Sequence, residues 1–185
     1  MGVITRNLSK SDLWGEYILI FVCVGSREYQ FNRLLRKIDE LIQNGEITEC
    51  VFAQIGKSSY IPQNYKYSRF MAVDEFKSYQ KKSDLIVSHG GTGALIGALK
   101  MGKQVLAVPR LEKYGEHTDD HQTQVAGVLE KEGYLRCILE MDDLLEGIKA
   151  YKKNPVLKIY NESSQVIGII EGFINSDADC KKRCE

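Results

Sequence analysis

Three glycines and a histidine mark the place in this sequence where chemistry is most readily expected. The segment His89-Gly90-Gly91-Thr92-Gly93 follows a short apolar run, Leu85–Ser88, and precedes a helical pattern that starts at Ala94. The first turn of a helix offers unpaired amide groups and a partial positive charge, which suit a phosphate group. Glycines let the backbone approach such an anion because no Cβ stands in the way. The segment predicts a diphosphate-binding turn in which His89 and Thr92 add donors, and a merely tight turn is the alternative.

A second polar cluster, Glu116-His117-Thr118-Asp119-Asp120-His121-Gln122, follows the run Val105–Val108. Capping of a helix by Thr118 or Asp119 explains only part of it. Carboxylates and an amide suit the vicinal hydroxyls of a ribose or a sugar, and this is the favoured interpretation. A metal site formed by His117, Asp120 and His121 is the alternative. It is disfavoured because these residues are adjacent in a loop and do not project at i, i+4 from a rigid element.

The apolar runs alternate with helical periods along the chain. Strands are predicted at 17–24, 50–55, 67–71, 85–88, 105–108 and 135–138, and helices at 31–44, 74–82 (with Asp74 as N-cap), 94–101, 120–132 and 141–151, with a last helix after Pro155. This alternation predicts a Rossmann-like α/β fold with a doubly wound, mostly parallel sheet. Strand order should reverse between the first and fourth strands. That reversal would bring the turns Gly25-Ser26-Arg27 and His89–Gly93 to one crevice.

Composition narrows the classes of function. The 185 residues carry 25 Lys and Arg against 25 Asp and Glu, so no basic surface points to nucleic acid. The polar segment 1–15 lacks the apolar core of a signal peptide, and no apolar run approaches the roughly 20 residues that span a bilayer. A cytoplasmic protein with one domain is therefore expected.

Five cysteines are an odd number for a disulfide framework. Cys23, Cys50 and Cys137 lie in apolar runs and are predicted to be small buried hydrophobes. The pair Cys180 and Cys184 lacks the second ligand pair that a metal site would need.

Several motifs taken together carry a family resemblance. They are Phe21–Ser26, Gln30–Leu34, Ser88–Leu95, Gly102-Lys103, Val108-Pro109-Arg110, Glu116-His117 and Asp119–Gln122. This set resembles the C-terminal domain of family 28 glycosyltransferases. It is also similar to the stand-alone catalytic subunits of two-component bacterial capsular and exopolysaccharide glycosyltransferases. Those subunits are similar in turn to the donor-binding subunit of the eukaryotic dolichol-linked N-acetylglucosamine transferase.

The resemblance implies one half of a GT-B enzyme. Residues 17–152 would form the nucleotide-sugar-binding domain, 1–16 a flexible extension, and 153–185 a C-terminal helix with a polar tail. A partner polypeptide would supply the acceptor half and the membrane anchor. The chain would then use a UDP-sugar and a lipid-linked acceptor while it associates peripherally with the inner face of the membrane. The C-terminal helix would either dock on that partner or close the chain's own sheet.

The resemblance also implies roles for single residues. Gly25 and Ser26, together with His89, Gly90, Gly91, Thr92 and Gly93, would face the diphosphate, the main chain of Phe70 and Met71 would hold uracil, and Glu116, Asp120 and Gln122 would meet hydroxyls. His89 and Glu116 are the candidate catalytic residues, with Glu28 as a local candidate for a general base. Family members place a ribose-binding Glu where this chain has Gly97, so the ribose contact must come from elsewhere. No Asp-x-Asp motif lies within residues 17–152, and no cofactor or metal requirement is expected.

Two other functions fit parts of the sequence. A non-catalytic nucleotide-sugar-binding subunit that assists a partner enzyme would use the same turns. An NAD-dependent oxidoreductase is disfavoured, because the first turn reads Gly25-Ser26-Arg27-Glu28 where a G-x-G-x-x-G motif would be needed.

Overall fold

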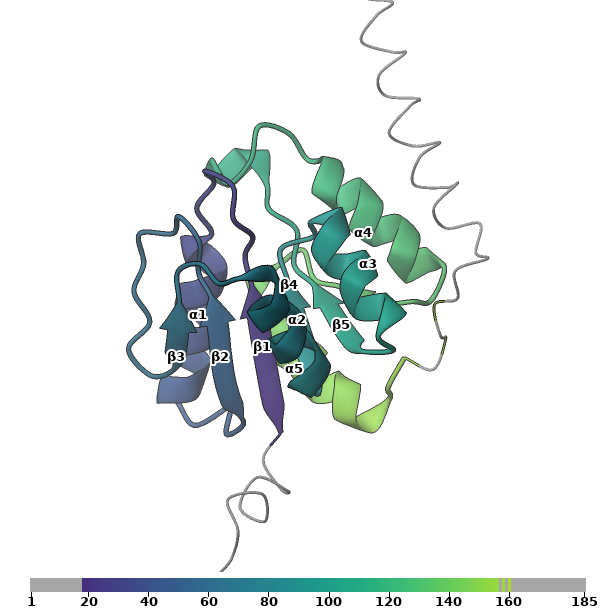
Figure 1. Ribbon diagram of the computed structural model, residues 1–185, viewed down its shortest axis with the longest axis horizontal. Coiled ribbons are helices and arrows are strands. Elements are labelled where there is room, and N and C mark those ends of the chain that lie inside the picture. Colours follow the sequence, from purple (N-terminus) through teal and green to yellow (C-terminus); the bar gives the residue numbers. More distant parts are fainter. Residues whose placement is uncertain (1–17, 157, 159, 161–185) are drawn as a thin grey trace, which may run out of the picture.

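The computed structural model describes residues 18–156, 158 and 160, and its centre is a parallel sheet (Figure 1). The strands are β1 (Leu19–Cys23), β2 (Cys50–Gln54), β3 (Lys66–Ser68), β4 (Leu85–Ser88), β5 (Gln104–Ala107) and β6 (Arg136–Cys137). They pair in the order β3-β2-β1-β4-β5-β6, and every pair is parallel. The prediction of a doubly wound, Rossmann-like fold is confirmed.

Helices cover both faces of the sheet because β1 buries side chains on both. The helices are α1 (Asn32–Gln43), α2 (Val73–Lys82), α3 (Thr92–Lys100), α4 (His121–Lys131) and α5 (Leu144–Lys153), with short 3-10 turns at Glu112–Tyr114 and Met141–Asp143. Ile20 and Val22 of β1 pack in one apolar cluster with α1 and α5. Phe21 and Cys23 face the other cluster, which includes side chains of α2, α3 and α4. A strand that is covered on both faces needs apolar side chains on both, which explains the continuous apolar run in the sequence.

Aromatic rings attach α2 to the sheet. Of this helix only Gln80 is buried, so its apolar stripe is thin. Tyr79 compensates by stacking on Phe52 of β2 with ring centroids 4.1 Å apart, and Phe76 meets Phe21 edge-on at 5.3 Å. Stacked and edge-on pairs add stabilisation beyond their buried area. These contacts hold α2 against β1 and β2.

The strand order reverses at β1, which places a crevice at its carboxyl end. From β1 the chain winds through β2 to β3 on one side, then returns to β4 and continues through β5 to β6 on the other. The turns that follow β1 and β4 therefore lie next to each other, as predicted. Ligands of open α/β sheets bind in this crevice.

Several predicted boundaries were wrong. The third strand ends at Ser68, so Phe70 and Met71 lie in the loop that follows it. The cap of α2 is Ala72 and not Asp74. The third helix starts at Thr92, two residues before the predicted start, because Gly91 already occupies the capping position.

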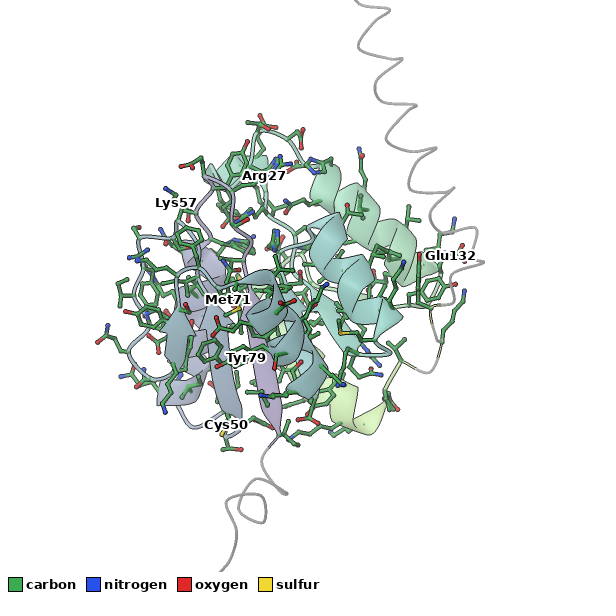
Figure 2. The ribbon with its side chains drawn as sticks, in the orientation of Figure 1. Arg27, Cys50, Lys57, Met71, Tyr79 and Glu132 are labelled. Atoms are coloured by element: carbon green, nitrogen blue, oxygen red, sulfur yellow. The ribbon has the colours of Figure 1, made fainter. Side chains whose placement is uncertain are left out.

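Cys50 is exposed and not buried, since it opens β2 at the edge of the sheet opposite the loop that carries Arg27 (Figure 2). The predicted helix at 141–151 begins as a 3-10 turn and becomes α5 only at Leu144.

The predicted flexible extension, 1–16, lies outside the described residues, as does most of the predicted C-terminal helix and tail. Among the helices that the structure describes, none has the length and apolar character needed to cross a bilayer.

A buried carboxylate fixes the loop between β2 and β3. Asp39 of α1 is 2% exposed and accepts hydrogen bonds from the Tyr60 hydroxyl (2.7 Å), from the amides of Gln63 and Asn64 (both 2.8 Å) and from the Asn64 side chain. Burial alone would raise the pKa of this carboxyl, but the hydrogen bonds outweigh burial and lower it. The charge is therefore a structural element of the fold.

We expect Asp39→Ala to lower the free energy of unfolding by about 3 kcal/mol, because it leaves buried donors without an acceptor. Urea denaturation at pH 7 measures this change. The adjacent exposed residue offers a control, Glu40→Ala, which should change the free energy of unfolding by less than about 0.5 kcal/mol. Equal effects of the two substitutions would contradict the assignment.

Candidate functional site

A cavity of about 560 Å³ occupies the crevice at the carboxyl ends of β1 and β4. This size is typical of sites for small molecules. Its ionisable lining residues are Arg27, His89, Arg110, His117 and His121, and among the described residues no carboxylate lines it. Apolar side chains, Met71, Val73 and Phe76, contribute another part of the wall. The lining suits an anion attached to an apolar or aromatic group.

Two glycine turns enclose the imidazole of His89. Gly25 and Gly90 have positive φ angles, 83° and 87°, which favour glycine. A Cβ built on Gly25 would lie 2.7 Å from Nε2 of His89, and one built on Gly91 only 2.4 Å from the same atom. The absence of side chains at both positions therefore makes room for the imidazole. A Cβ on Gly93 would meet nothing within 4 Å.

The first turn of α3 faces the same cavity. Gly91, Thr92 and Gly93 line it together with Gly25 and Ser26. The first amides of a helix have no partner within the helix, and no side chain caps α3. Unsatisfied amides and the positive end of the helix dipole thus meet at the cavity. The structure thus brings Gly25, Ser26, Gly91, Thr92 and Gly93 to one cavity, and their role toward a diphosphate stays a prediction. Gly90 supplies the turn but is not itself a lining residue.

The tautomer of His89 follows from the hydrogen bond that its ring forms with Cys23. Nδ1 lies 3.1 Å from the carbonyl oxygen of Cys23, and because a carbonyl only accepts, Nδ1 carries the proton. Burial, followed by the positive charge of Arg110, lowers the pKa of His89 to about 3. The ring is therefore neutral at pH 7 with a lone pair on Nε2. From the sequence, His89 is expected to act as a donor. In this tautomer Nε2 donates only after it takes up a proton.

Gln54, at the end of β2, fixes the turn after β1. Its side-chain oxygen accepts from the Gly25 amide at 3.0 Å, and its nitrogen donates to the Gly25 carbonyl at 2.8 Å and to the Arg69 carbonyl at 3.1 Å. Gln54 is 3% exposed and lines the cavity. Sequence reasoning missed it because one polar residue at the end of an apolar strand carries no specific pattern.

Arg110 places a buried positive charge beside the cavity. Its side chain is 2% exposed and donates from Nη2 to the carbonyl oxygens of Val24 and Tyr29, the latter at 3.2 Å. Nε has no hydrogen-bond partner, and among the described residues no carboxylate pairs with the guanidinium. Burial lowers the pKa of Arg110 to about 10, so the group stays charged at pH 7. In the sequence Arg110 is marked only by the motif Val108-Pro109-Arg110, directly after β5.

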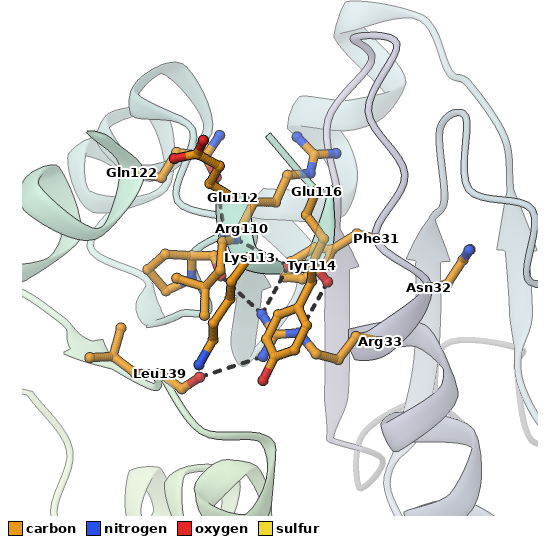
Figure 3. A network of polar contacts seen from close by, with 12 residues as sticks. Phe31, Asn32, Arg33, Arg110, Glu112, Lys113, Tyr114, Glu116, Gln122 and Leu139 are labelled. Atoms are coloured by element: carbon orange, nitrogen blue, oxygen red, sulfur yellow. Dashed lines mark hydrogen bonds and ion pairs between the residues drawn. The ribbon is translucent and has the colours of Figure 1, made fainter. Parts of the chain in front are cut away.

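Glu116 does not lie at the cavity, where the sequence predicts it. It is 1% exposed, and its two carboxylate oxygens accept from Nε and Nη2 of Arg33, both at 3.0 Å (Figure 3). The Leu111 amide also donates to it at 3.1 Å. Glu116 is not among the residues that line the cavity. Its charge is used to hold the loop after β5 against α1, because Arg33 satisfies both oxygens.

Of four other predicted site residues, one lines the cavity and three do not. Glu28 is exposed and forms an ion pair of 3.6 Å with Lys57, outside the cavity lining. Asp120 also lies outside it and accepts from the Glu112 amide at 2.8 Å. Phe70 is 47% exposed and its carbonyl already accepts from Ser68 at 2.7 Å. Gln122 does line the cavity, with its oxygen held by the Arg110 amide at 3.1 Å.

Two histidines of the predicted polar cluster, His117 and His121, also line the cavity. The sequence predicts neither of them to bind a hydroxyl group. His117 packs against Tyr29 with ring centroids 4.4 Å apart, and His121 opens α4. Burial, followed by the charge of His121, lowers the pKa of His117. Both rings line the cavity and both contact Asp119.

Known proteins resemble parts of this chain in sequence and share its fold. Over 95 residues the chain is 30% identical to the UDP-N-acetylglucosamine transferase subunit ALG13 of Cryptococcus neoformans, a match that covers 50% of this chain and 42% of that protein. Among solved structures, a glycotransferase of kitacinnamycin superposes with a TM-score of 0.57 at 16% identity, covering 84% of this chain and 40% of the other. An NMR structure of ALG13 superposes with a TM-score of 0.53 at 20% identity, covering 80% and 91%. These structures share the fold.

The family is established by a longer match. Residues 19–183 match the model of the glycosyltransferase family 28 C-terminal domain. This span includes all six strands, both glycine turns and every residue that lines the cavity. The chain therefore belongs to the family of glycosyltransferase family 28 C-terminal domains.

Proposed function

We propose that this chain is the catalytic, donor-binding half of an inverting glycosyltransferase that uses a UDP-sugar. The observation that carries the proposal is the charge of the cavity. Two arginines and the positive end of α3 border it, three histidines also line it, and the described part of the chain places no carboxylate in its wall. A diphosphate, with its negative charges, is complementary to such a lining. The name of the ALG13 relative, a UDP-N-acetylglucosamine transferase subunit, supports UDP as the nucleotide.

In the proposed reaction an acceptor hydroxyl attacks the anomeric carbon as UDP leaves from the opposite face. The bond from the anomeric carbon to the phosphate oxygen breaks, and the departing diphosphate gains negative charge. The amides of Thr92 and Gly93 and the guanidinium of Arg110 stabilise that charge, since they are fixed before the reaction starts. Gln122 presents its amide nitrogen to a hydroxyl of the sugar or the ribose. The transfer thus relies on groups of the chain itself for charge stabilisation.

The general base that accepts the proton of the attacking hydroxyl is proposed to come from the acceptor half. Glu28 and Glu116 lie outside the cavity, so neither lies beside a bound donor, where the acceptor hydroxyl would lose its proton. A partner that is anchored to the membrane and carries the acceptor site would complete the enzyme, transferring a hexose to a lipid-linked acceptor in surface polysaccharide synthesis. The chain would then lie at the inner face of the membrane, held there by its partner.

Calorimetric titration of the chain with UDP, ADP and NAD tests the nucleotide assignment. Saturable UDP binding that is at least tenfold tighter than ADP or NAD binding is the expected result. NAD binding without UDP binding would overturn the proposal.

The alternative, a subunit that binds the nucleotide-sugar without taking part in catalysis, is separated by a transfer assay with the partner. Arg110→Met should then abolish transfer even at saturating donor, whereas a merely assisting subunit would leave the rate unchanged.

The glycine turn gives a prediction with a built-in control. Gly91→Ala places a Cβ where the His89 ring lies, and the ring must leave the cavity wall, so UDP affinity should fall about tenfold or more. The control is Gly127→Ala in α4, where a Cβ meets no neighbouring atom and does not line the cavity, so the affinity should stay within about threefold of the wild type. Both affinities can be measured in the same calorimetric experiment. Equal affinities of the two variants would contradict the packing of His89 against Gly91.

A further inference from the structure

Three side chains of the loop that leads into α4 converge on a point at the rim of the cavity. The potential ligand atoms of His117, Asp119 and His121 all lie within 4.8 Å of one another. Nδ1 of His117 lies 3.3 Å from Oδ1 of Asp119, and Nδ1 of His121 contacts the same oxygen. Two imidazoles thus face one carboxylate oxygen.

Two imidazoles and a carboxylate are a ligand set that zinc and other first-row divalent cations take in proteins. Two ligands of a tetrahedral zinc ion, each bonded at about 2.0 Å, lie about 3.3 Å from each other. The pair His117 and Asp119 already has this separation. The alternative is a hydrogen-bonded trio without a cation, in which Asp119 only orients the two rings.

Neighbouring groups hold the three side chains in place. The His117 ring packs on Tyr29, and its side chain is 7% exposed. Asp119 also accepts a hydrogen bond from the His121 amide at 3.2 Å, which ties the carboxylate to the start of α4. His121 is about half exposed and leaves the cluster open to ions from solution. The buried His117 fixes the site, and the exposed His121 lets a cation enter it from solution.

We propose that His117, Asp119 and His121 bind a divalent cation of the zinc class, with a coordination position open toward the cavity. Three protein ligands leave at least one position for water or another oxygen. That position faces the cavity because both imidazoles line it. The set differs from the one considered from sequence, since Asp120 points to the Glu112 amide and Asp119 takes its place. The cation site does not depend on the proposed transfer of a sugar.

Zinc titration of the full chain tests the site, with a chromophoric chelator as competitor and Co²⁺ absorption as a second readout. We expect one equivalent of Zn²⁺ to bind. Asp119→Asn removes the ligand charge and should weaken binding by at least about tenfold. The control is Asp120→Asn, which changes the same functional group one residue away and should leave the affinity within about threefold of the wild type.

Three results would overturn the proposal. The first is the absence of saturable zinc binding to the folded chain. The second is an unchanged affinity in Asp119→Asn. The third is a Co²⁺ spectrum with an intense thiolate charge-transfer band, which would place the ion on cysteines such as Cys180 and Cys184. No nucleotide is present in this experiment, so its outcome is independent of whether UDP is the ligand of the cavity.

Discussion

Replacing Arg110 with methionine is expected to weaken UDP binding about 100-fold. The guanidinium is buried beside the cavity, forms no ion pair with a described carboxylate, and has an Nε without a partner. In the proposed complex it faces the diphosphate. A hydrogen bond to a charged group contributes about 1.5–3 kcal/mol, and 2.8 kcal/mol is about a 100-fold change in affinity. Calorimetry at low ionic strength measures the dissociation constant directly.

The control for this experiment is Arg36→Met. Arg36 is an exposed residue of α1 whose guanidinium lies over the Tyr60 ring, 5.3 Å from its centroid, and it does not line the cavity. The two substitutions change net charge equally, so a general effect of charge on UDP binding would appear in both. Thermal unfolding of Arg110→Met is needed as well, because Arg110 also holds two carbonyl groups of the loop after β1. A folded Arg110→Met protein that binds UDP within about threefold of the wild type would contradict the assignment.

The second large effect is a loss of stability in acid caused by His89. Its pKa is lowered to about 3 in the folded chain, from 6.5, by burial and by the nearby charge of Arg110. As the pH falls below 6.5 the unfolded chain takes up a proton that the folded chain does not, so stability is lost as the pH falls and is fully present above 6.5. At pH 4 the loss from this residue amounts to roughly 3 kcal/mol. That is a large part of the 5–15 kcal/mol that stabilises an ordinary domain.

The variant His89→Asn isolates this contribution. Its amide can still donate to the Cys23 carbonyl, but it does not titrate. Urea denaturation at pH 7 and at pH 4 should show a decrease in the free energy of unfolding that is smaller in the variant by roughly 3 kcal/mol. Carboxylates such as Asp39 also lose stabilising charge in acid, but they do so in both proteins and cancel in the comparison. Parallel pH profiles would show that His89 does not resist protonation.

The strands and the glycine turns could be predicted from sequence because both depend on local patterns. Buried strands appear as short apolar runs, and a turn with positive φ at Gly25 and Gly90 needs glycine, whatever surrounds it. The match between the predicted and observed strands at Leu85–Ser88 has the same cause. The same local patterns misplace strand ends. The third strand is predicted to reach Met71 because Phe70 is β-prone, but its pairing with β2 ends at Ser68.

The roles of charged residues could not be predicted, because each depends on which group lies opposite in the folded chain. Glu116 is an acid beside the predicted site, and nothing near it in sequence indicates that Arg33 pairs with it. Arg110 resembles any surface arginine in sequence, yet the carbonyl groups of Val24 and Tyr29 draw it into the interior. Asp119 and Asp120 differ by one position, and only the backbone of the loop decides which of them meets the histidines.

The pairing of Arg33 with Glu116 has a consequence for how the chain acquires its site. It joins residues 83 positions apart, and the bonds from Arg110 to Val24 and Tyr29 span 86 and 81 positions. Closing such long loops costs conformational entropy before any contact is gained, so contacts of this kind form late in folding. During synthesis the glycine turns emerge from the ribosome well before the loop that follows β5. The nascent chain therefore has no complete cavity until that loop has folded back onto β1.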